Sequence, residues 1–273
     1  LTNLGSAWTG DLSRTVLSAN WMAAAGHAGE DAKLFDTVRA VGMELCPELG
    51  IAIPVGKDSL SMQTRWQQDG EDRSVTAPLS LIISAFAPVG DVRKTVTPQL
   101  QSGTEHSCLL LVDLGEGRNR LGASALSQVY GQLGQQGPDL DNAELFRTAF
   151  ETLQSMLEQD LLLAYHDRSD GGLVVTLCEM AFAGRSGLHC DVTPLGDDVI
   201  ATLFAEELGV VVQVLESNLP RVESMLEQAG IAHCCHRLGQ PESGEQLKIV
   251  HAGETVLEES IVTLQRAWAE TTP

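Results

Sequence analysis

Short apolar runs alternate with segments of helical periodicity along this 273-residue chain, and this alternation most limits the folds that it can adopt. The clearest case is the apolar run 161–165, which is followed by a polar loop and then by the apolar-striped segment 172–184. A strand or helix with an apolar face is stable only when that face packs against another element. The sequence therefore predicts a two-layered protein of the α+β or α/β class.

Residues 99–273 contain most of these alternating elements. We expect helices where apolar residues recur every three or four positions, and strands where short apolar runs lie between turn residues. The expected strands are 108–115, 161–165, 187–193, 208–215, 231–239 and 246–253, and the expected helices are 121–133, 143–159, 172–184, 219–230 and 261–270.

Residues 1–98 predict a simpler order of two helices followed by two strands. Pro47 and Gly50 are expected to end the second helix, and a polar hairpin is expected between the two strands. The expected helices are 12–24 and 34–45, the expected strands are 51–56 and 79–89, and the hairpin is centred on 67–74.

A composition shift separates these two parts of the chain. The stretch 95–107 is polar, contains Pro98 and Gly103, and follows the last strand of the first part. Such stretches commonly mark domain boundaries. We expect one domain at 1–98 and a second at 99–273. Because the chain begins at Leu1 without a methionine, we interpret it as a fragment.

Charge and composition exclude several classes of function. The net charge is −20, with 8 basic and 11 acidic residues in 1–98 but 9 basic and 26 acidic residues in 99–273. Nucleic-acid binding requires basic surfaces, so we expect no nucleic-acid partner. Neither a signal peptide nor an apolar run of membrane-spanning length is visible, which favours a cytoplasmic protein without a membrane partner. The six cysteines form no CxxC pair and are expected to be reduced packing residues.

The loop 166–172, with the sequence HDRSDGG, is the first candidate site. A helix N-terminus binds anions through its unpaired N–H groups, and Asp167 at a strand end could hold Mg²⁺. Ser169 could donate a hydrogen bond to a phosphate or a nucleotide. The alternative is structural: Ser169 or Asp170 caps the helix, Asp167 pairs with Arg168 or solvent, and the glycines only shape the turn. Considered alone, the residues favour this alternative.

The segment 53–62, with the turn GKDS at residues 56–59, is the second candidate. A strand is expected to run into Gly56 and to continue as a phosphate-reading turn, in which Lys57 supplies a point charge. The P-loop pattern is absent, and an ordinary turn with an exposed pair of Lys57 and Asp58 is the favoured alternative.

Two further segments are weaker candidates. The glycines of 113–126 resemble a nucleotide loop, but Arg118 and Arg120 interrupt the pattern, which favours a structural role. The segment 23–36 brings His27 near two acidic residues, but it lacks zinc-ligand spacing and indicates a solvated loop before a helix.

Long stretches of the chain nevertheless resemble one enzyme family. The segment 17–62, which contains SANWMAAAGHAGED, is similar to the large form of phosphoribosylformylglycinamidine synthase. The segments 76–100, 162–184 and 267–272 are similar to the same family. The resemblance covers nearly the whole chain. It implies an α+β fold, in which the end of an aminoimidazole-ribotide-synthetase-like N-terminal subdomain is followed by its C-terminal α/β subdomain.

The resemblance also implies a reaction and partners. Members of this family are ATP-dependent ligases of purine biosynthesis that convert formylglycinamide ribonucleotide to formylglycinamidine ribonucleotide, with ammonia from a glutaminase domain. This chain would be part of the second synthetase-like half. The first half and the glutaminase domain, elsewhere in the same polypeptide, would be its partners, and we expect the isolated chain to be inactive, with no catalytic residue of its own.

Site residues follow from the resemblance position by position. Asn3 and Asp167 match Mg²⁺ ligands of an auxiliary site for ATP or ADP, and Ser169 matches a nucleotide contact there. Gly56 and Ser59 match a turn that contacts ATP and substrate, although Lys57 replaces the metal-binding Asn of the smaller family form.

Two other functions remain open at this point. The chain could be a non-catalytic module that holds an auxiliary ADP and Mg²⁺ and docks the glutaminase domain. It could also belong to a related synthetase, such as selenophosphate synthetase, a hydrogenase-maturation protein or thiamine-phosphate kinase. The block SANWMAAAGHAGED argues against this last group.

Overall fold

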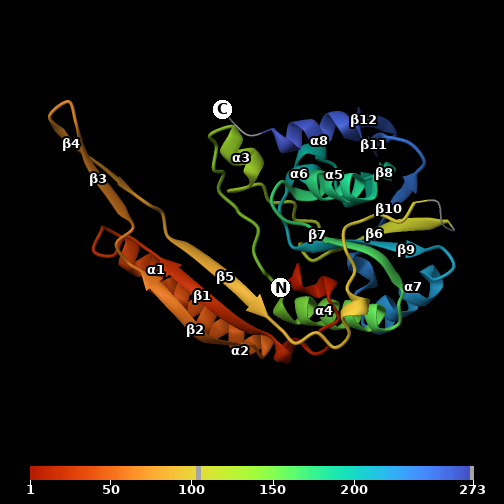
Figure 1. Ribbon diagram of the computed structural model, residues 1–273, viewed down its shortest axis with the longest axis horizontal. Helices are drawn as coiled ribbons and strands as arrows, with labels where there is room; N and C mark the ends of the chain where they lie inside the picture. Colours follow the sequence, from red (N-terminus) through yellow and green to blue (C-terminus); the bar gives the residue numbers. More distant parts are fainter. Residues whose placement is uncertain (103–105, 271–273) are drawn as a thin grey trace. The chain divides into compact units, whose positions relative to one another are not determined.

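The computed structural model describes residues 1–102 and 106–270 and divides the chain into two compact units (Figure 1). The smaller unit is Thr9–Gly90, and the larger unit combines Leu1–Trp8 with Asp91–Pro273. Gly103, in the polar stretch predicted to hold the domain boundary, and residues 271–272 of the family resemblance lie outside the described residues.

The smaller unit is built on a three-stranded sheet with the order β2-β1-β5. The parallel pair is β1 (Val16–Met22) with β2 (Ala52–Ser59), and β5 (Ser80–Phe86) runs antiparallel to β1. A helical segment joins β1 to β2 through α1 (Glu30–Val38), the π-helical η3 (Arg39–Leu45) and α2 (Cys46–Leu49). Helical conformation continues through Pro47 and ends at Gly50, whose φ of 69° is left-handed. The predicted hairpin is present as β3 (Gln63–Gln68) and β4 (Glu71–Thr76).

The predicted helix at 12–24 is wrong. Only Leu12–Arg14 form a short 3-10 turn, and β1 follows directly. Leu17 and Ala19 are buried on one face of the strand, whereas Val16 is exposed on the other. These residues fit a helical stripe and an alternating strand equally well. Hydrogen bonds to strands on both sides of β1 decide in favour of the strand.

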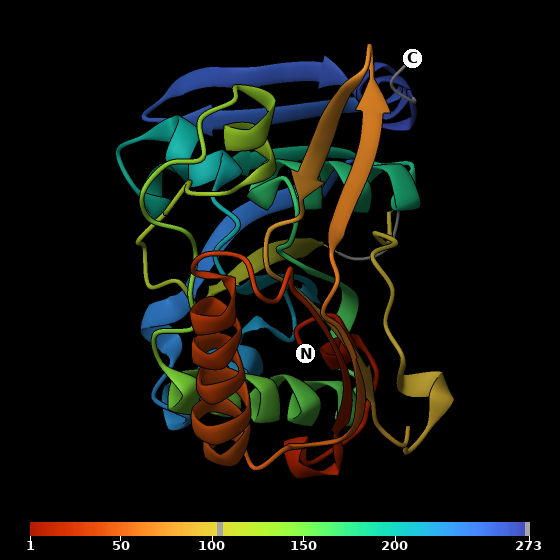
Figure 2. The ribbon, with the colours of Figure 1, turned by 90° about the vertical axis from the view of Figure 1, so that its left-hand side faces the viewer.

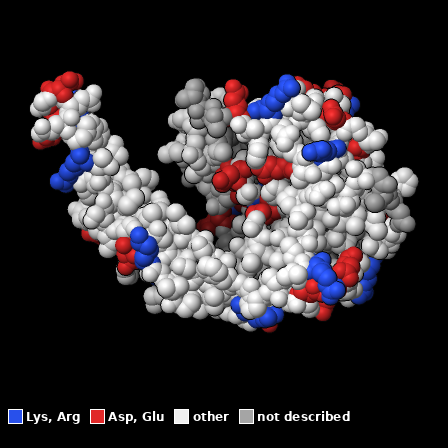
Figure 3. All heavy atoms as spheres, in the orientation of Figure 1, with Lys and Arg blue, Asp and Glu red and all other residues white. Residues whose placement is uncertain are grey.

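One face of the small sheet carries exposed apolar side chains. Val55, Ile82 and Phe86 are each more than half exposed, and the strand register places them on the same face. In the space-filling view, most of the smaller unit's visible surface carries no charge (Figure 3).

The larger unit contains a seven-stranded sheet with the order β12-β11-β8-β10-β6-β9-β7. Only the pair β8 and β11 is parallel. The strands are β6 (Ser107–Asp113), β7 (Leu162–Asp167), β8 (Gly187–Asp191), β9 (Gly209–Leu215), β10 (Cys235–Glu242), β11 (Gln246–His251) and β12 (Glu254–Ser260).

Helices cover both faces of this sheet (Figures 1 and 2). On one side lie α5, α6 and α8, and on the other lie α4 and α7. Their bounds are α4 (Ala143–Glu158), α5 (Gly172–Gly184), α6 (Val199–Phe204), α7 (Leu219–Gln228) and α8 (Ile261–Ala269), and α3 (Ala125–Val129) is a shorter helix than the one predicted at 121–133.

The core of the larger unit lies between the sheet and α5. Leu109 and Leu111 of β6 are fully buried there, in the same hydrophobic cluster as Leu173 and Leu177 of α5. The even-numbered residues of β6 face the opposite layer, because successive side chains of a strand point to opposite faces. The α+β class predicted from the sequence is confirmed. The strand β12 and helix α6 were not predicted.

Hydrogen bonds attach residues Leu1–Trp8 to the rest of the larger unit. The buried Tyr165 hydroxyl donates to the carbonyl oxygen of Thr2 at 2.6 Å, and Gln154 Nε2 of α4 donates to the carbonyl oxygens of Gly5 and Ala7. The units therefore divide at Trp8 and Gly90, and the domain boundary predicted at 98 and 99 stays a prediction.

The remaining composition-based expectations concern membranes and cysteines. Among the described residues, no helix combines the length and apolarity needed to cross a membrane. All six cysteines are free thiols, and five of them are buried. Burial raises the pKa of the Cys190 thiol to about 12, so this side chain serves packing.

Candidate functional site

The loop after β7 is shaped by two glycines with left-handed backbone. Asp167 is the last residue of β7, and α5 starts at Gly172. Gly171 and Gly172 have φ values of 84° and 72°. A Cβ on Gly172 would lie 2.7–2.8 Å from the backbone of residues 203–205, so the end of α6 approaches this loop more closely than any side chain permits.

Asn3 and Asp167 lie side by side at the end of β7. Asn3 Nδ2 donates to Asp167 Oδ1 at 3.2 Å, across 164 positions of sequence. Burial disfavours the Asp167 carboxylate, but the neighbouring His166 ring and the hydrogen bond from Asn3 outweigh burial and lower the pKa of Asp167. Asp167 is therefore ionised at neutral pH and available to a cation.

His166 is held between two acidic residues. Its Nε2 lies 2.7 Å from Glu179 Oε2, and its Nδ1 lies 2.8 Å from the carbonyl oxygen of Asp167. Burial lowers the pKa of His166, but the bonds to Asp167 and Glu179 outweigh burial and raise it overall. Both ring nitrogens face acceptors, and only the doubly protonated imidazolium donates to both.

The buried Arg168 side chain holds the loop 166–172 against the end of β6 and the segment before β9. Its guanidinium is buried, its Nη2 lies 2.5 Å from Asp113 Oδ1, and its Nε donates to the carbonyl oxygen of Glu207 at 2.6 Å. Asp113 also accepts from two backbone N–H groups in the turn that follows β6. The structural alternative that paired Asp167 with Arg168 is wrong, because Arg168 turns inward to Asp113.

The capping alternative is also wrong. The N-cap of α5 is Gly171, and no side chain caps the helix from that position. Ser169 is exposed, and only its carbonyl oxygen has a part in the turn, where it accepts from Gly172 N at 2.9 Å. Glu206 Oε1 instead accepts from Gly171 N and from Ala125 N, each at 2.8 Å. The Glu206 carboxylate therefore lies at the N-terminus of α5, where a bound anion was expected from the sequence.

Gly56 and Ser59 lie in the smaller unit, and the turn predicted around them is wrong. Both residues belong to β2, which continues through the GKDS segment in register with β1. Gly56 is needed because a Cβ there would lie 2.6 Å from the carbonyl oxygen of Ala19. Ser59 Oγ lies 3.5 Å from Asn20 Oδ1. Lys57 and Asp58 are exposed, and none of the ion pairs within the described residues joins them.

The two weaker candidates have structural roles. Arg120 of the glycine-containing loop pairs with the buried Glu207 and with Asp141. At the start of α1, Asp31 accepts from Gly26 N of the preceding loop, and Glu30 pairs with Lys33. Within residues 1–102 and 106–270, no group of three or more His, Cys, Asp or Glu side chains is arranged as metal ligands.

The pair of Asn3 and Asp167 nevertheless fits a magnesium ion. Mg²⁺ prefers oxygen ligands, retains several waters and is commonly held by one or two protein carboxylates together with substrate phosphates. Asp167 supplies an ionised carboxylate, and Asn3 supplies an amide oxygen once its side chain is flipped.

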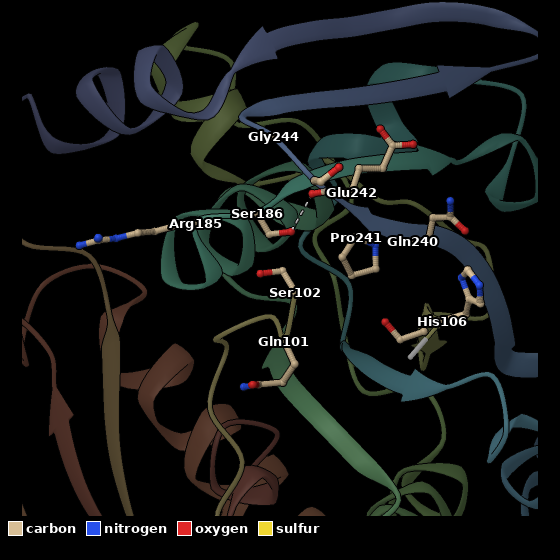
Figure 4. Close-up of a pocket in the computed structure, with 11 residues that line it drawn as sticks. Gln101, Ser102, His106, Arg185, Ser186, Gln240, Pro241, Glu242 and Gly244 are labelled. Carbon is tan, nitrogen blue, oxygen red and sulfur yellow. Dashed lines mark hydrogen bonds between the residues drawn. The ribbon is translucent and has the colours of Figure 1, made fainter. Parts of the chain in front are cut away.

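A polar cavity of about 400 Å³ lies elsewhere in the larger unit (Figure 4). It is lined by Gln101, His106, Ser186 and Glu242, among others, and Arg185 points away from the other labelled residues. Ser186 Oγ donates to the carbonyl oxygen of Glu242 at 3.1 Å. None of the predicted site residues lines this cavity, so we place the candidate site at Asp167 because of its chemistry.

Sequence reasoning did not find Glu179, Glu206 or Asp113 as residues of the site. Glu179 lies in α5, Asp113 ends β6, and Glu206 lies in the loop after α6, and no motif marks any of them. Only the fold brings these carboxylates to the loop.

Two family models match the chain in succession. The FGAR-AT PurM_N-like domain matches residues 1–88, and the C-terminal domain of AIR synthase related protein matches residues 105–252, which is more than half of the chain. The chain belongs to the AIR synthase-related family. The resemblance stated from the sequence is confirmed, and its N-terminal part is of the FGAR amidotransferase type.

Solved structures share the fold at low sequence identity. PurL of Thermotoga maritima complexed with ATP has a TM-score of 0.61 and 12% identity over 93% of this chain and 38% of PurL. The same protein complexed with FGAR gives 0.62 and 13% over 93% of this chain and 40% of PurL. The hydrogenase maturation protein HypE in complex with ATP gives 0.62 and 16%, over 93% of this chain and 75% of HypE. This chain therefore spans about two fifths of the PurL chains that it matches.

Proposed function

We propose that this chain forms the second synthetase-like half of an FGAR amidotransferase, the ATP-dependent ligase that makes formylglycinamidine ribonucleotide in purine biosynthesis. One observation carries the proposal: an FGAR amidotransferase-type N-terminal domain is followed by an AIR synthase-related C-terminal domain in a single chain. The fold shared with HypE does not distinguish these enzymes, but the domain matched at residues 1–88 favours the amidotransferase.

The auxiliary nucleotide site is proposed at the end of β7. Asp167 and Asn3 would hold Mg²⁺ together with the phosphates of ADP or ATP, and the exposed Ser169 hydroxyl would contact the nucleotide. The cation would neutralise phosphate charge that this acidic chain cannot neutralise itself. Asp167 would contribute its carboxylate without a proton to release, because its pKa is already lowered.

We further propose that this nucleotide has a structural role. Glu206 accepts from the N-cap amide of Gly171, and the first amide of α5, Gly172 N, is bonded to the carbonyl oxygen of Ser169. The helix N-terminus therefore offers the phosphates fewer donors than a free terminus would. In the reaction itself, Gly56 and Ser59 would contact ATP and FGAR. The reaction would also require the first synthetase-like half and the glutaminase domain. The isolated chain is then expected to bind nucleotide without synthase activity.

The proposal predicts that Asp167→Ala greatly weakens Mg²⁺-dependent binding of ADP. Loss of the charged ligand is expected to raise the Kd for ADP in the presence of Mg²⁺ by about 100-fold or more. Asn3→Ala is expected to raise this Kd by a smaller factor, because Asn3 carries no charge. Isothermal titration calorimetry of the full 273-residue chain measures both.

Asp170→Ala is the matched control, because Asp170 lies exposed in the same loop. It removes an equal charge and is expected to leave the Kd unchanged. Absence of Mg²⁺-dependent ADP binding in the unchanged chain, or equal losses in the Asp167 and Asp170 variants, would contradict the proposed site.

A further inference from the structure

A continuous series of side-chain contacts leads from the terminal helix α8 to Asp167. Trp268 Nε1 of α8 donates to Glu179 Oε1 at 2.9 Å. The other oxygen of Glu179 lies 2.7 Å from His166 Nε2, and His166 Nδ1 lies 3.6 Å from Asp167 Oδ1. These contacts join α8, α5 and β7 within the larger unit.

The Glu179 carboxylate is fixed from both sides. Each of its oxygens has one partner, so rotation about its last bond would break both hydrogen bonds. The Trp268 ring also packs edge-on against Phe182, with ring centroids 6.1 Å apart. Phe182 follows Glu179 by three positions on α5, so the two residues lie on the same helix face. Trp268 therefore contacts α5 at two points.

The His166 ring transmits this arrangement to Asp167. The ring bonds Glu179 at one edge and the backbone carbonyl of Asp167 at the other. Its orientation thereby fixes the peptide from which the Asp167 carboxylate projects. Metal ligands are commonly oriented by such outer contacts, and loss of one typically lowers metal affinity about 10–100-fold.

We propose that Glu179 is a positioning residue that orients Asp167 through His166, and that Trp268 couples this orientation to the seating of α8. The proposal rests on the proposed function, because Asp167 is a metal ligand only if the nucleotide site exists. Glu179 touches neither the cation nor the nucleotide in this scheme. Its effect is confined to the cation-dependent part of nucleotide binding.

The decisive variant is Glu179→Gln. Glutamine keeps the shape of the side chain but has one acceptor oxygen, so it cannot accept from both Trp268 and His166. We expect the Kd for ADP with Mg²⁺ to rise by about 10–100-fold. The Kd for ADP without Mg²⁺ is expected to stay the same, whereas general loosening of the fold would change both. Calorimetry of the full chain with and without Mg²⁺ separates the two.

Trp268→Phe tests the coupling to α8. It keeps an aromatic ring against Phe182 but removes the N–H donor, so a smaller loss of Mg²⁺-dependent affinity is expected. The matched control is Trp66→Phe, since Trp66 is partly exposed on β3 of the smaller unit, and no change is expected. By reciprocity, Mg²⁺ and ADP together are expected to alter Trp268 fluorescence, measured as the difference between the unchanged chain and Trp268→Phe.

Each outcome decides between the two proposals. If Asp167→Ala abolishes binding while Glu179→Gln binds ADP with Mg²⁺ like the unchanged chain, the positioning role is wrong and the proposed function stands. Equal weakening of Glu179→Gln with and without Mg²⁺ also rejects the positioning role. If the unchanged chain shows no Mg²⁺-dependent binding, the proposed nucleotide site is wrong and this inference fails with it.

Discussion

Arg168→Met is expected to lower the free energy of unfolding of the larger unit by about 3–5 kcal/mol, the usual cost of removing one partner of a buried ion pair. Arg168 and Asp113 are 3% and 4% exposed. Methionine retains most of the apolar length of arginine but leaves the Asp113 carboxylate without its countercharge. The carbonyl oxygens of Glu207 and Leu208 lose a donor as well. Urea unfolding followed by circular dichroism measures the change.

Two controls identify the unpaired charge as the cause. Arg221→Met removes an exposed guanidinium that, within residues 1–102 and 106–270, bonds only Gln159, and its effect is expected to stay within about 0.5 kcal/mol. Adding Asp113→Asn to Arg168→Met removes the buried charge, so the double variant is expected to be more stable than Arg168→Met alone. If Asp113→Asn lowered stability further, desolvation of an unpaired carboxylate would not be the cause.

Gly172→Ala is expected to destabilise the larger unit by about 2–5 kcal/mol, since a left-handed alanine costs about 1–2 kcal/mol and overpacking adds about 1–3 kcal/mol. The new Cβ would meet backbone atoms of residues 203–205, which cannot turn aside as a side chain can. We expect the same variant to lose Mg²⁺-dependent ADP binding, because the loop carrying Asp167 must shift. Thermal and urea unfolding measure stability, and calorimetry measures binding.

Gly230→Ala separates the two costs. Gly230 has a φ of 75°, close to that of Gly172, but nothing lies within 4 Å of the Cβ position. Gly230→Ala is therefore expected to lower the free energy of unfolding only by the cost of a left-handed alanine, about 1–2 kcal/mol. Equal losses for the two variants would show that the close approach of residues 203–205 contributes nothing.

Local sequence patterns predicted the larger unit better than the smaller one. The bounds of α5 are those expected from its apolar stripe and the preceding glycines, and α4 and α8 end within a residue of their predicted ends. In β1, by contrast, the apolar residues fit both a helical and an alternating pattern. The strand forms because β1 pairs with β2 and β5. Strand β12 was missed because it is an edge strand with mostly exposed positions, so it lacks an apolar pattern.

The candidate site was likewise predicted only in part. The residues of the loop 166–172 stand out as a polar segment between two apolar elements, so sequence reasoning finds Asp167 as a candidate. Its pairing with Asn3 was reached only through family resemblance, since no local pattern links positions 164 apart. Glu179 carries no signal at all: it lies mid-helix, and its role depends on the packing of α8 against α5.

The attachment of Leu1–Trp8 to the larger unit makes the smaller unit an insertion, joined to the rest of the chain by two covalent connections. A single cut near Gly90 would leave both parts linked. A chain that starts at Asp91 would lack the backbone partners of Tyr165 and Gln154, and it would also lack Asn3. We expect a synthetic peptide of the first eight residues to restore both packing and Mg²⁺-dependent binding to such a chain, by fragment complementation.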